Sequence, residues 1–313
     1  MSERTQLSTQ VTVSQNSSAF TRLLAEVLST SVEAAAEALG ALFDISAPAY
    51  SAQELLQGVV MSAQNLSITE LEALRQQLPT IPPVQLEPIA KAQGLLKALE
   101  ENPVLRLGMH SLTQNRSQLH KAQGLLSNAR HLLETGSVRE SARFAEQAQS
   151  LLVNGLQTLH DRLAEAQHRF VVQAAKESLR SLGYQWQAAQ REGWTAIWAA
   201  RGAKGIAVLV SPDNELTIDM LGWEGTACQG ELNEFLKALQ ERGVSFSSGR
   251  RFPHGRREGG VLLQGALRIA RTRRLPLPQA LLIAAEPRLA PQRSTQRLLA
   301  ALLQQQIRQG GAR

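Results

Sequence analysis

The sequence predicts a mainly α-helical protein that continues into a small α+β domain and ends in a basic tail. Three observations carry this prediction. Apolar residues recur at helical spacing over much of residues 17–182, and four short apolar segments follow between residues 184 and 221. The last 70 residues hold thirteen arginines against two acids. The aromatic content of 4% also fits helices packed through leucine and alanine.

Four parts are expected along the chain: a disordered N-terminus at residues 1–16, a helical domain at 17–162, a small α+β domain at 163–248 and a basic tail at 249–313. The N-terminus is rich in serine, threonine and glutamine and lacks a hydrophobic period, which favours disorder. The tail is expected to close with a helix over residues 294–307, where leucines recur at helical spacing.

The first half of the helical domain is expected to hold helices at residues 17–44, 51–66 and 67–78. The break between the last two is predicted by Ser67-Ile-Thr-Glu70, which matches a capping box. Pro82-Pro83 then interrupts the pattern, because proline has no amide to donate and restricts the residue before it. The chain becomes helical again after these prolines.

A long antiparallel helical hairpin is expected to turn near Gly136. This glycine can adopt the left-handed conformation that ends a helix, and Ser137 with Glu140 matches a capping box that begins the next one. The second helix is expected to run from residue 138 to about 182. Its apolar stripe alternates steps of three and four, as in a coiled coil. The stripe consists of Leu156, Leu159, Leu163, Ala166 and Phe170.

Two segments of the helical domain are identical over six residues. KAQGLLKAL at residues 91–99 and KAQGLLSNA at 121–129 lie thirty positions apart. A true repeat would imply stacked helical hairpins. The alternative is chance reuse of good helix formers in a chain rich in alanine, glutamine and leucine. The uneven spacing of the related AQELL and AQSLL segments favours chance.

Four short apolar segments after Gly183 are expected to form a three- or four-stranded antiparallel sheet. They lie at residues 184–190, 194–201, 204–211 and 215–221. Gly202-Ala203 matches a two-residue hairpin, and Ser211-Pro-Asp-Asn214 matches a type I turn. An amphipathic helix over residues 226–242 is expected to follow, so the segment forms a compact α+β unit.

No recognised metal, phosphate or catalytic motif occurs in the sequence. No two of the six histidines are three or four residues apart, and the chain lacks a phosphate-binding loop, a nucleophile elbow and a zinc-protease motif. We therefore expect neither metal nor cofactor. The start MSERTQLSTQ lacks a signal-peptide pattern, and no apolar run reaches the ~18–20 residues of a membrane span. With one cysteine, the chain is expected to be cytoplasmic.

Cys228 is the one candidate nucleophile. It lies between a predicted strand and the start of a predicted helix, where the helix dipole and free amides stabilise a thiolate. With His254 it could form a Cys–His pair. The alternative, which is the usual fate of a free cysteine, is a small buried residue that packs the helix onto the sheet.

The stretch from Val210 to Cys228 resembles a small family of bacterial proteins of unknown function. Their pattern is a strand, a turn, a second strand and then G-F-x-G-x-x-C entering a helix; here Gly222, Gly225 and Cys228 match, and Trp223 replaces the phenylalanine. The likeness extends over residues 179–245. Members are often encoded near MoxR-type AAA ATPases. The resemblance therefore implies an accessory role beside such an ATPase.

The basic tail is the candidate binding segment. It carries a net charge of +11 in a chain of +6, so the rest of the chain is at −5. Exposed guanidiniums can neutralise phosphates, and an aromatic ring between them can stack on a base. The candidate contact residues are Arg250, Arg251, Phe252, Arg256, Arg257, Arg271, Arg273 and Arg274, and Arg268 lies in the same stretch.

Three interpretations of this tail stay open: a nucleic-acid contact, a contact with an acidic protein, and a solvated tail in a chain whose 27 arginines against 6 lysines come from GC-rich coding. A membrane surface is disfavoured, since no basic helix has a continuous apolar face. The leading expectation is a non-enzymatic adaptor or scaffold in a bacterial multi-protein assembly. The alternatives are a nucleic-acid-binding protein acting through the tail and an enzyme that depends on Cys228.

Overall fold

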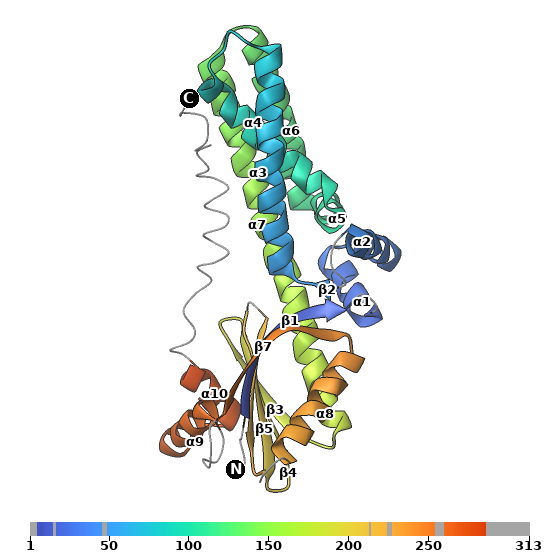
Figure 1. Ribbon diagram of the computed structural model, residues 1–313, viewed down its shortest axis with the longest axis vertical. Helices are drawn as coiled ribbons and strands as arrows, with labels where there is room; N and C mark the ends of the chain where they lie inside the picture. Colours follow the sequence, from blue (N-terminus) through green and yellow to red (C-terminus); the bar gives the residue numbers. More distant parts are fainter. Residues whose placement is uncertain are drawn as a thin grey trace. The chain divides into compact units, whose positions relative to one another are not determined.

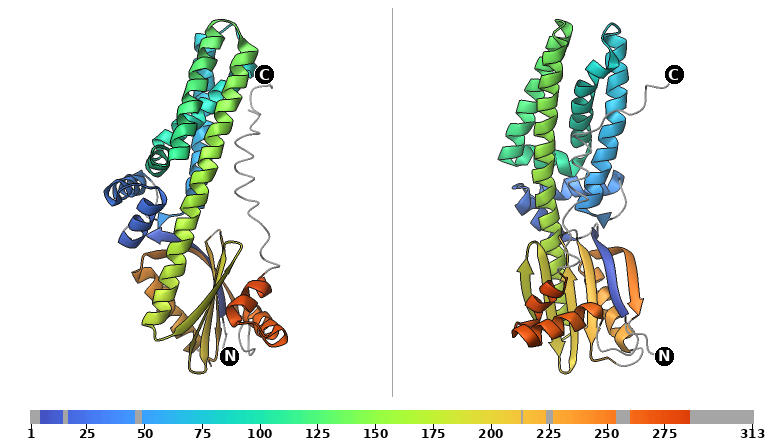
Figure 2. Two further views of the ribbon diagram at one scale, coloured as in Figure 1. Left: turned by 180° about the vertical axis from the view of Figure 1, so that it is seen from behind. Right: turned by 90° about the vertical axis from the view of Figure 1, so that its left-hand side faces the viewer.

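The computed structural model describes residues 5–14, 17–45, 49–212, 214–223, 227–253 and 260–285 (Figures 1 and 2). The chain divides into two compact units. Of the described residues, the sheet unit comprises those up to 20, residues 49–51 and those from 164 to 285, and the helical unit comprises residues 21–45 and 52–163. One continuous helix, α7 (Val138–Ser181), contributes residues to both.

The sheet unit is built on a seven-stranded antiparallel sheet. Its strands are β1 (Thr5–Ser14), β2 (Ala49–Tyr50), β3 (Gln185–Arg191), β4 (Trp194–Arg201), β5 (Lys204–Val210), β6 (Glu215–Leu221) and β7 (Val244–Pro253). The order β3-β4-β5-β6-β1 is followed by β7 on the far side of β1, and β2 pairs with the end of β1. The four strands expected from the sequence, β3 to β6, are confirmed as an antiparallel meander.

The prediction that residues 1–16 are disordered is wrong for residues 5–14, which form β1. This strand lies between β6 and β7, and both neighbours satisfy its backbone groups. The apolar positions Leu7, Val11 and Val13 are buried, but so are Thr9 and Thr12. Because buried threonines replace part of the expected apolar alternation, the segment has the composition of a solvated tail while it forms an interior strand.

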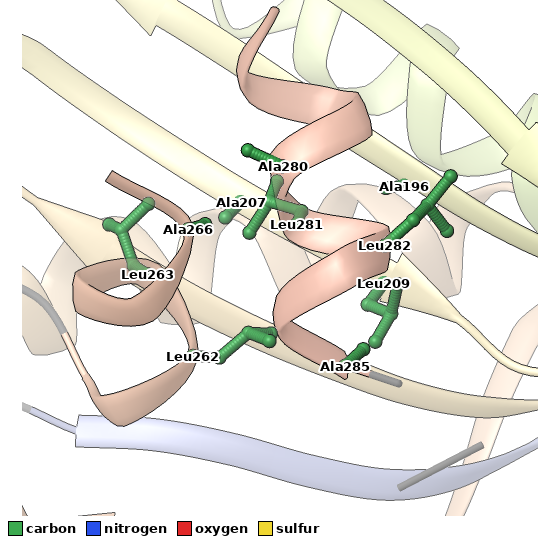
Figure 3. Packing of buried hydrophobic residues seen from close by; sticks show 10 residues of the cluster. All are labelled: Ala196, Ala207, Leu209, Leu262, Leu263, Ala266, Ala280, Leu281, Leu282 and Ala285. Carbon is green, nitrogen blue, oxygen red and sulfur yellow. The ribbon is translucent and has the colours of Figure 1, made fainter. Parts of the chain in front are cut away.

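Helices cover both faces of the sheet (Figure 1). On one face lie the C-terminal part of α7 and α8 (Ala227–Glu241), as the contacts of His168 with Thr195 and of Cys228 with Met220 show. On the other face lie α9 (Val261–Arg273) and α10 (Leu277–Ala285). Figure 3 shows how these two helices pack on β4 and β5. The shared cluster consists of Ala196, Ala207, Leu209, Leu262, Leu263, Ala266, Ala280, Leu281, Leu282 and Ala285.

The prediction of a basic tail from residue 249 is therefore wrong up to residue 285. Residues 249–253 belong to β7, and α9 with α10 completes a second layer on the sheet. The proline-rich segment before α10 packs because Pro278 stands in the first helical turn, where an amide is not needed. The expected terminal helix at residues 294–307 lies outside the described residues.

The helical unit holds α2 (Val32–Ile45), α3 (Ala52–Gln77), α4 (Pro83–Glu101), α5 (Pro103–Ser111), α6 (Thr113–Glu134), α7 up to Leu163 and the part of α1 (Ser18–Val27) from Thr21 onward. The expected single helix over residues 17–44 is instead α1 and α2. The chain breaks at Ser29, whose φ is +52°, and the Ala34 amide donates to Ser31 Oγ at 3.1 Å to begin α2.

The expected helix start at Ser67 is also wrong, because α3 runs unbroken through it. Ser67 Oγ donates back to the Ala63 carbonyl at 2.5 Å rather than capping a new helix. An added Cβ at Gly94 of α4 would lie 2.5 Å from the Ser67 nitrogen, so the two helices touch through their backbones here. This close packing of α3 on α4 overrides the local capping signal.

The antiparallel hairpin of α6 and α7 is confirmed. Gly136 has a φ of +81°, and the amides of Ser137 and Gly136 donate to the carbonyls of Leu132 and Leu133 at 2.8 and 3.1 Å, which is a Schellman motif. Two side-chain bonds fix the register, and in each of them the two bonded residues lie equally far along the chain from Thr135. Ser141 Oγ donates to the Ala129 carbonyl at 2.6 Å, and Asn115 Nδ2 donates to the Gly155 carbonyl at 3.2 Å. The predicted apolar stripe of α7 is buried.

Candidate functional site

The strongest charged feature that the structure describes is a group of four arginines at the end of α9, here called the α9 arginines. They are Arg268, Arg271, Arg273 and Arg274, and all four are exposed. Within the described ranges, none of their guanidinium groups forms a hydrogen bond or an ion pair. Arg271 and Arg273 lie in the last helical turn, where a cation offsets the helix dipole. Four uncompensated guanidiniums within two turns exceed what capping needs.

The position of the α9 arginines is set by the packing of the opposite side of α9. Leu262, Leu263 and Ala266 are buried against the sheet, which leaves the polar side of the helix to solvent. Arg274 ends the helix in a left-handed conformation with a φ of +52°, and its amide donates to the Ala270 carbonyl. The arginines are therefore presented by a packed helix and not by a flexible segment.

A buried carboxylate on β6 caps the N-terminus of α9. Asp219 is fully buried, and its Oδ1 accepts hydrogen bonds from the amides of Gly260 at 2.6 Å and Met220 at 2.9 Å. Its Oδ2 accepts from the Leu263 amide at 3.0 Å. Amides of the first turn of a helix have no partner within the helix, so Asp219 caps α9 from a distant strand. No sequence motif signals this contact, and the sequence analysis missed it.

The structure separates the predicted contact residues into three groups. Arg271, Arg273 and Arg274 lie together at the end of α9. Arg250, Arg251 and Phe252 lie in β7, where their backbones pair with Ser8, Leu7 and Gln6 of β1. Arg256, Arg257 and His254 lie outside the described residues. Arg250, Arg251 and Phe252, which the sequence placed in the basic tail, are therefore residues of a sheet strand.

Cys228 lies in the first turn of α8, as predicted, but it is buried. Its side chain is 3% exposed, and its Sγ lies 3.7 Å from Met220 Sδ on β6. This is the packing role that the sequence analysis gave as the alternative to a nucleophile. Gly222 has a φ of +86°, and an added Cβ would lie 2.4 Å from the Ala203 carbonyl oxygen, which explains why glycine stands there. Gly225 lies outside the described residues.

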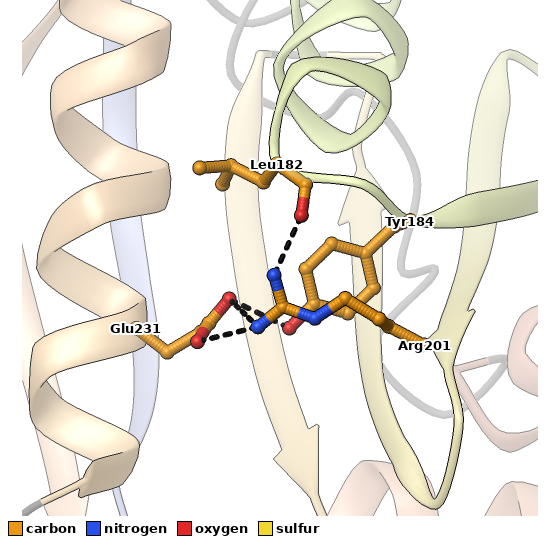
Figure 4. Close-up of polar contacts among 4 residues, drawn as sticks. All are labelled: Leu182, Tyr184, Arg201 and Glu231. Atoms are coloured by element: carbon orange, nitrogen blue, oxygen red, sulfur yellow. Dashed lines mark hydrogen bonds and ion pairs between the residues drawn. The ribbon is translucent and has the colours of Figure 1, made fainter.

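A polar cluster that the sequence analysis missed joins α8 to the sheet (Figure 4). Arg201 donates from Nη2 to both oxygens of Glu231 at 2.8 and 3.0 Å and from Nη1 to the Leu182 carbonyl at 2.6 Å. Tyr184 donates its hydroxyl to Glu231 at 2.7 Å, and its ring lies 4.6 Å from the guanidinium. Burial, together with the hydrogen bond to Glu231, raises the pKa of Tyr184. These groups meet their hydrogen-bonding needs within the cluster, so its role is structural: it holds α8 against the sheet. We call it the polar lock.

His168 of α7 also makes both of its ring hydrogen bonds within the core. Its Nδ1 lies 3.0 Å from the Ser211 carbonyl, which can only accept, so Nδ1 carries the proton. Its Nε2 then accepts from Thr195 Oγ1 at 2.9 Å. Burial lowers the pKa of His168, which favours the neutral ring. The contacts bind α7 to β4 and to the turn after β5.

In the described part of the chain, no three histidine, cysteine or acidic side chains come together as a metal site would require. None of the helices described combines the length and the apolar character needed to cross a membrane.

Comparison with known proteins adds no relative. No protein-family model, no curated sequence and no solved structure matches the chain.

Proposed function

We propose that this protein is a non-enzymatic adaptor or scaffold that binds an anionic protein partner through the α9 arginines. The observation that carries the proposal is the exposure of four guanidiniums that have no ion-pair partner among the described residues, on a helix held by Asp219 and an apolar cluster. A rigid, charged surface suits recognition, because few degrees of freedom are lost when the partner binds.

The use made of the reactive side chains supports a binding role. Cys228 packs in the core, His168 bridges two buried acceptor and donor groups, and Asp219 caps a helix. Each of these groups is committed to the fold of the sheet unit. The resemblance of residues 179–245 to proteins encoded beside MoxR-type AAA ATPases makes such an ATPase the first partner to test.

Nucleic acid is the second candidate partner, and the same arginines favour it. Guanidiniums form bidentate bonds with phosphate, and several together give a strongly salt-dependent affinity. For a nucleic acid, each arginine that contacts a phosphate should reduce the slope of log affinity against log salt by about one when it is removed.

The test compares two variants of the full-length chain. In the first, Arg268, Arg271, Arg273 and Arg274 are all changed to glutamine, which removes the charge and keeps the helix propensity. In the control, four exposed arginines of the helical unit are changed in the same way: Arg106, Arg116, Arg139 and Arg143. Both variants lose the same charge, so a difference between them reports position.

Cross-linked complexes are then recovered from the native host, and binding to a DNA oligonucleotide is measured by fluorescence anisotropy. The adaptor proposal expects a protein partner that the wild type and the control recover and the α9 variant does not. Recovery of the same proteins by all three would overturn it. DNA binding that only the α9 variant loses would instead establish the second candidate.

A further inference from the structure

The strand β3 forms an edge of the sheet. It pairs with β4 along its whole length, from Gln185 opposite Ala200 to Arg191 opposite Trp194, and the register has no bulge. No strand in the described ranges pairs with its other side. Such an edge presents a row of unpaired amides and carbonyls, which can pair with a strand of another chain. The free side of β3 is therefore a candidate interaction surface.

The turn between β3 and β4 determines which residues present these groups. Glu192 and Gly193 have φ values of +51° and +79°, as in a two-residue turn of type I′. The residues that flank such a turn, Arg191 and Trp194, are bonded to each other, and bonding to the neighbouring strand then alternates along the chain. Every second residue of β3, counted from Arg191, therefore bonds to β4. The N–H and C=O groups of the others point to the open edge; these outward residues are Trp186, Ala188 and Gln190.

The features by which proteins usually protect a sheet edge are missing from β3. Its sequence QWQAAQR contains neither proline nor lysine, and Nε of its one charged side chain, Arg191, lies 3.3 Å from the Glu192 carboxylate. The outer strand β7, by contrast, contains two arginines and Pro253, and its register with β1 shifts after Gln10. Prolines, charges and bulges discourage pairing with a further strand. Of these two outer strands, β3 is therefore the one open to pairing.

The pattern of β3 suits a second copy of the same strand. In an antiparallel pair centred on Ala188, this residue lies opposite its own copy, and Trp186 lies opposite Gln190. Outward residues then meet outward residues, so the N–H and C=O groups of each pair bond to each other. Arg191 lies opposite Gln185, so no like charges of the two strands meet. The small, exposed alanines at the centre leave space for the half-buried tryptophan of each copy.

We propose that two copies of this protein associate through β3 and form one continuous antiparallel sheet. The contact is self-complementary and uses the same edge of both copies, so the association closes at two chains. The inference goes beyond the proposed function, because the contact uses none of the α9 arginines. A dimer carries two groups of these arginines, which strengthens its binding to a partner with repeated anionic sites.

The test measures the association of the full-length protein by analytical ultracentrifugation over a range of concentrations. Ala188→Lys places two lysines opposite each other in the dimer, and the control Ala73→Lys changes an exposed alanine of α3. We expect the wild type and the control to dimerise equally, and Ala188→Lys to raise the dissociation constant at least about fivefold. Ala188→Glu alone should have the same effect. An equal mixture of Ala188→Lys and Ala188→Glu should restore the dimer, because each lysine then lies opposite a glutamate.

Hydrogen exchange, resolved by residue, locates the contact without any variant. The amides of the three outward residues should exchange more slowly in the dimer than in the dilute monomer, whereas those of Gln187 and Ala189, which already bond to β4, should not change. A wild type that stays monomeric at every concentration would overturn the proposal. So would equal dissociation constants for Ala188→Lys and Ala73→Lys, a mixture of charged variants that stays monomeric, or outward amides whose exchange is independent of concentration.

Discussion

The carboxylate of Asp219 and the amide of Gly260 form a 2.6 Å hydrogen bond between residues 41 positions apart in the chain. This bond fixes Gly260, the N-cap residue of α9, against the interior of the sheet. It also leaves no room for a side chain, because an added Cβ at Gly260 would lie 2.6 Å from Asp219 Oδ2. The arginines that end α9 therefore depend on a contact at its other end.

Asp219→Ala should destabilise the sheet unit by about 3 kcal/mol, because it leaves buried amides without their acceptor. Urea unfolding measures the loss, and hydrogen exchange should show the Gly260 and Leu263 amides losing protection first. The control Asp44→Asn changes an exposed carboxyl and should alter the free energy of unfolding by less than about 0.5 kcal/mol. Equal effects of the two variants would contradict the capping role.

Two Gly→Ala substitutions should change the free energy of unfolding in opposite directions. Gly260→Ala forces a methyl group against Asp219 and should cost about 1–3 kcal/mol of stability. Gly124→Ala, in the exposed middle of α6 with no atom within 4 Å of the new Cβ, should stabilise by about 0.5–1 kcal/mol through helix propensity. Chemical denaturation of both variants checks the pair, and stabilisation by Gly260→Ala would refute the close approach.

Lowering the pH should decrease the free energy of unfolding, because His168 becomes protonated. Since burial lowers the pKa of this ring, its contribution to stability is complete above the unfolded pKa of about 6.5 and is lost as the pH falls through the lower folded value. The free energy of unfolding, measured from pH 8 down to pH 5, should therefore decrease. His168→Gln should flatten part of that decrease. An unchanged pH profile in the variant would show that another group is responsible.

Arg201 and Glu231 should show measurable coupling. Their bidentate pair is partly exposed, so a double-mutant cycle with Arg201→Gln and Glu231→Gln should give about 1 kcal/mol rather than the larger values of buried pairs. Tyr184→Phe should cost a similar amount by removing the hydroxyl bond. Additive single effects at low salt would mean that the cluster does not act as a lock.

Cys228 should react slowly with a thiol reagent in the folded protein, because its side chain is buried against Met220. Labelling should accelerate with added urea in step with unfolding of the sheet unit. Rapid labelling in native buffer would restore the thiol-dependent enzyme as a candidate.

Local signals explain which parts of the fold could be predicted. Gly136 ends a helix by its own conformation, and the strands from β3 to β6 are joined by short turns, so both features could be identified from neighbouring residues. The strand β1 could not, because its partner β7 lies far along the chain; Thr12 and Ser245, which touch, are 233 positions apart. At Ser67, the local capping signal was overridden by the packing of α3 against Gly94.

In the candidate site, too, some features could be predicted from neighbouring residues and others depend on residues distant in the chain. The charge of the α9 arginines could be counted in the sequence, but their attachment could not, because a single aspartate inside a strand gives no signal of the helix it caps. The charge excess also suggested a loose tail, whereas leucines and alanines between the arginines pack on the sheet. The polar cluster of Arg201, Glu231 and Tyr184 arises from residues that only folding brings together.

We propose that a partner is bound through the α9 arginines. The most direct measurement is the dissociation constant of the recovered partner for the wild type, the α9 glutamine variant and the helical-unit control at two salt concentrations. We predict weaker binding only for the α9 variant, and the loss of affinity should shrink at the higher salt concentration because salt screens the charges. Equal dissociation constants for the α9 variant and the control would contradict it.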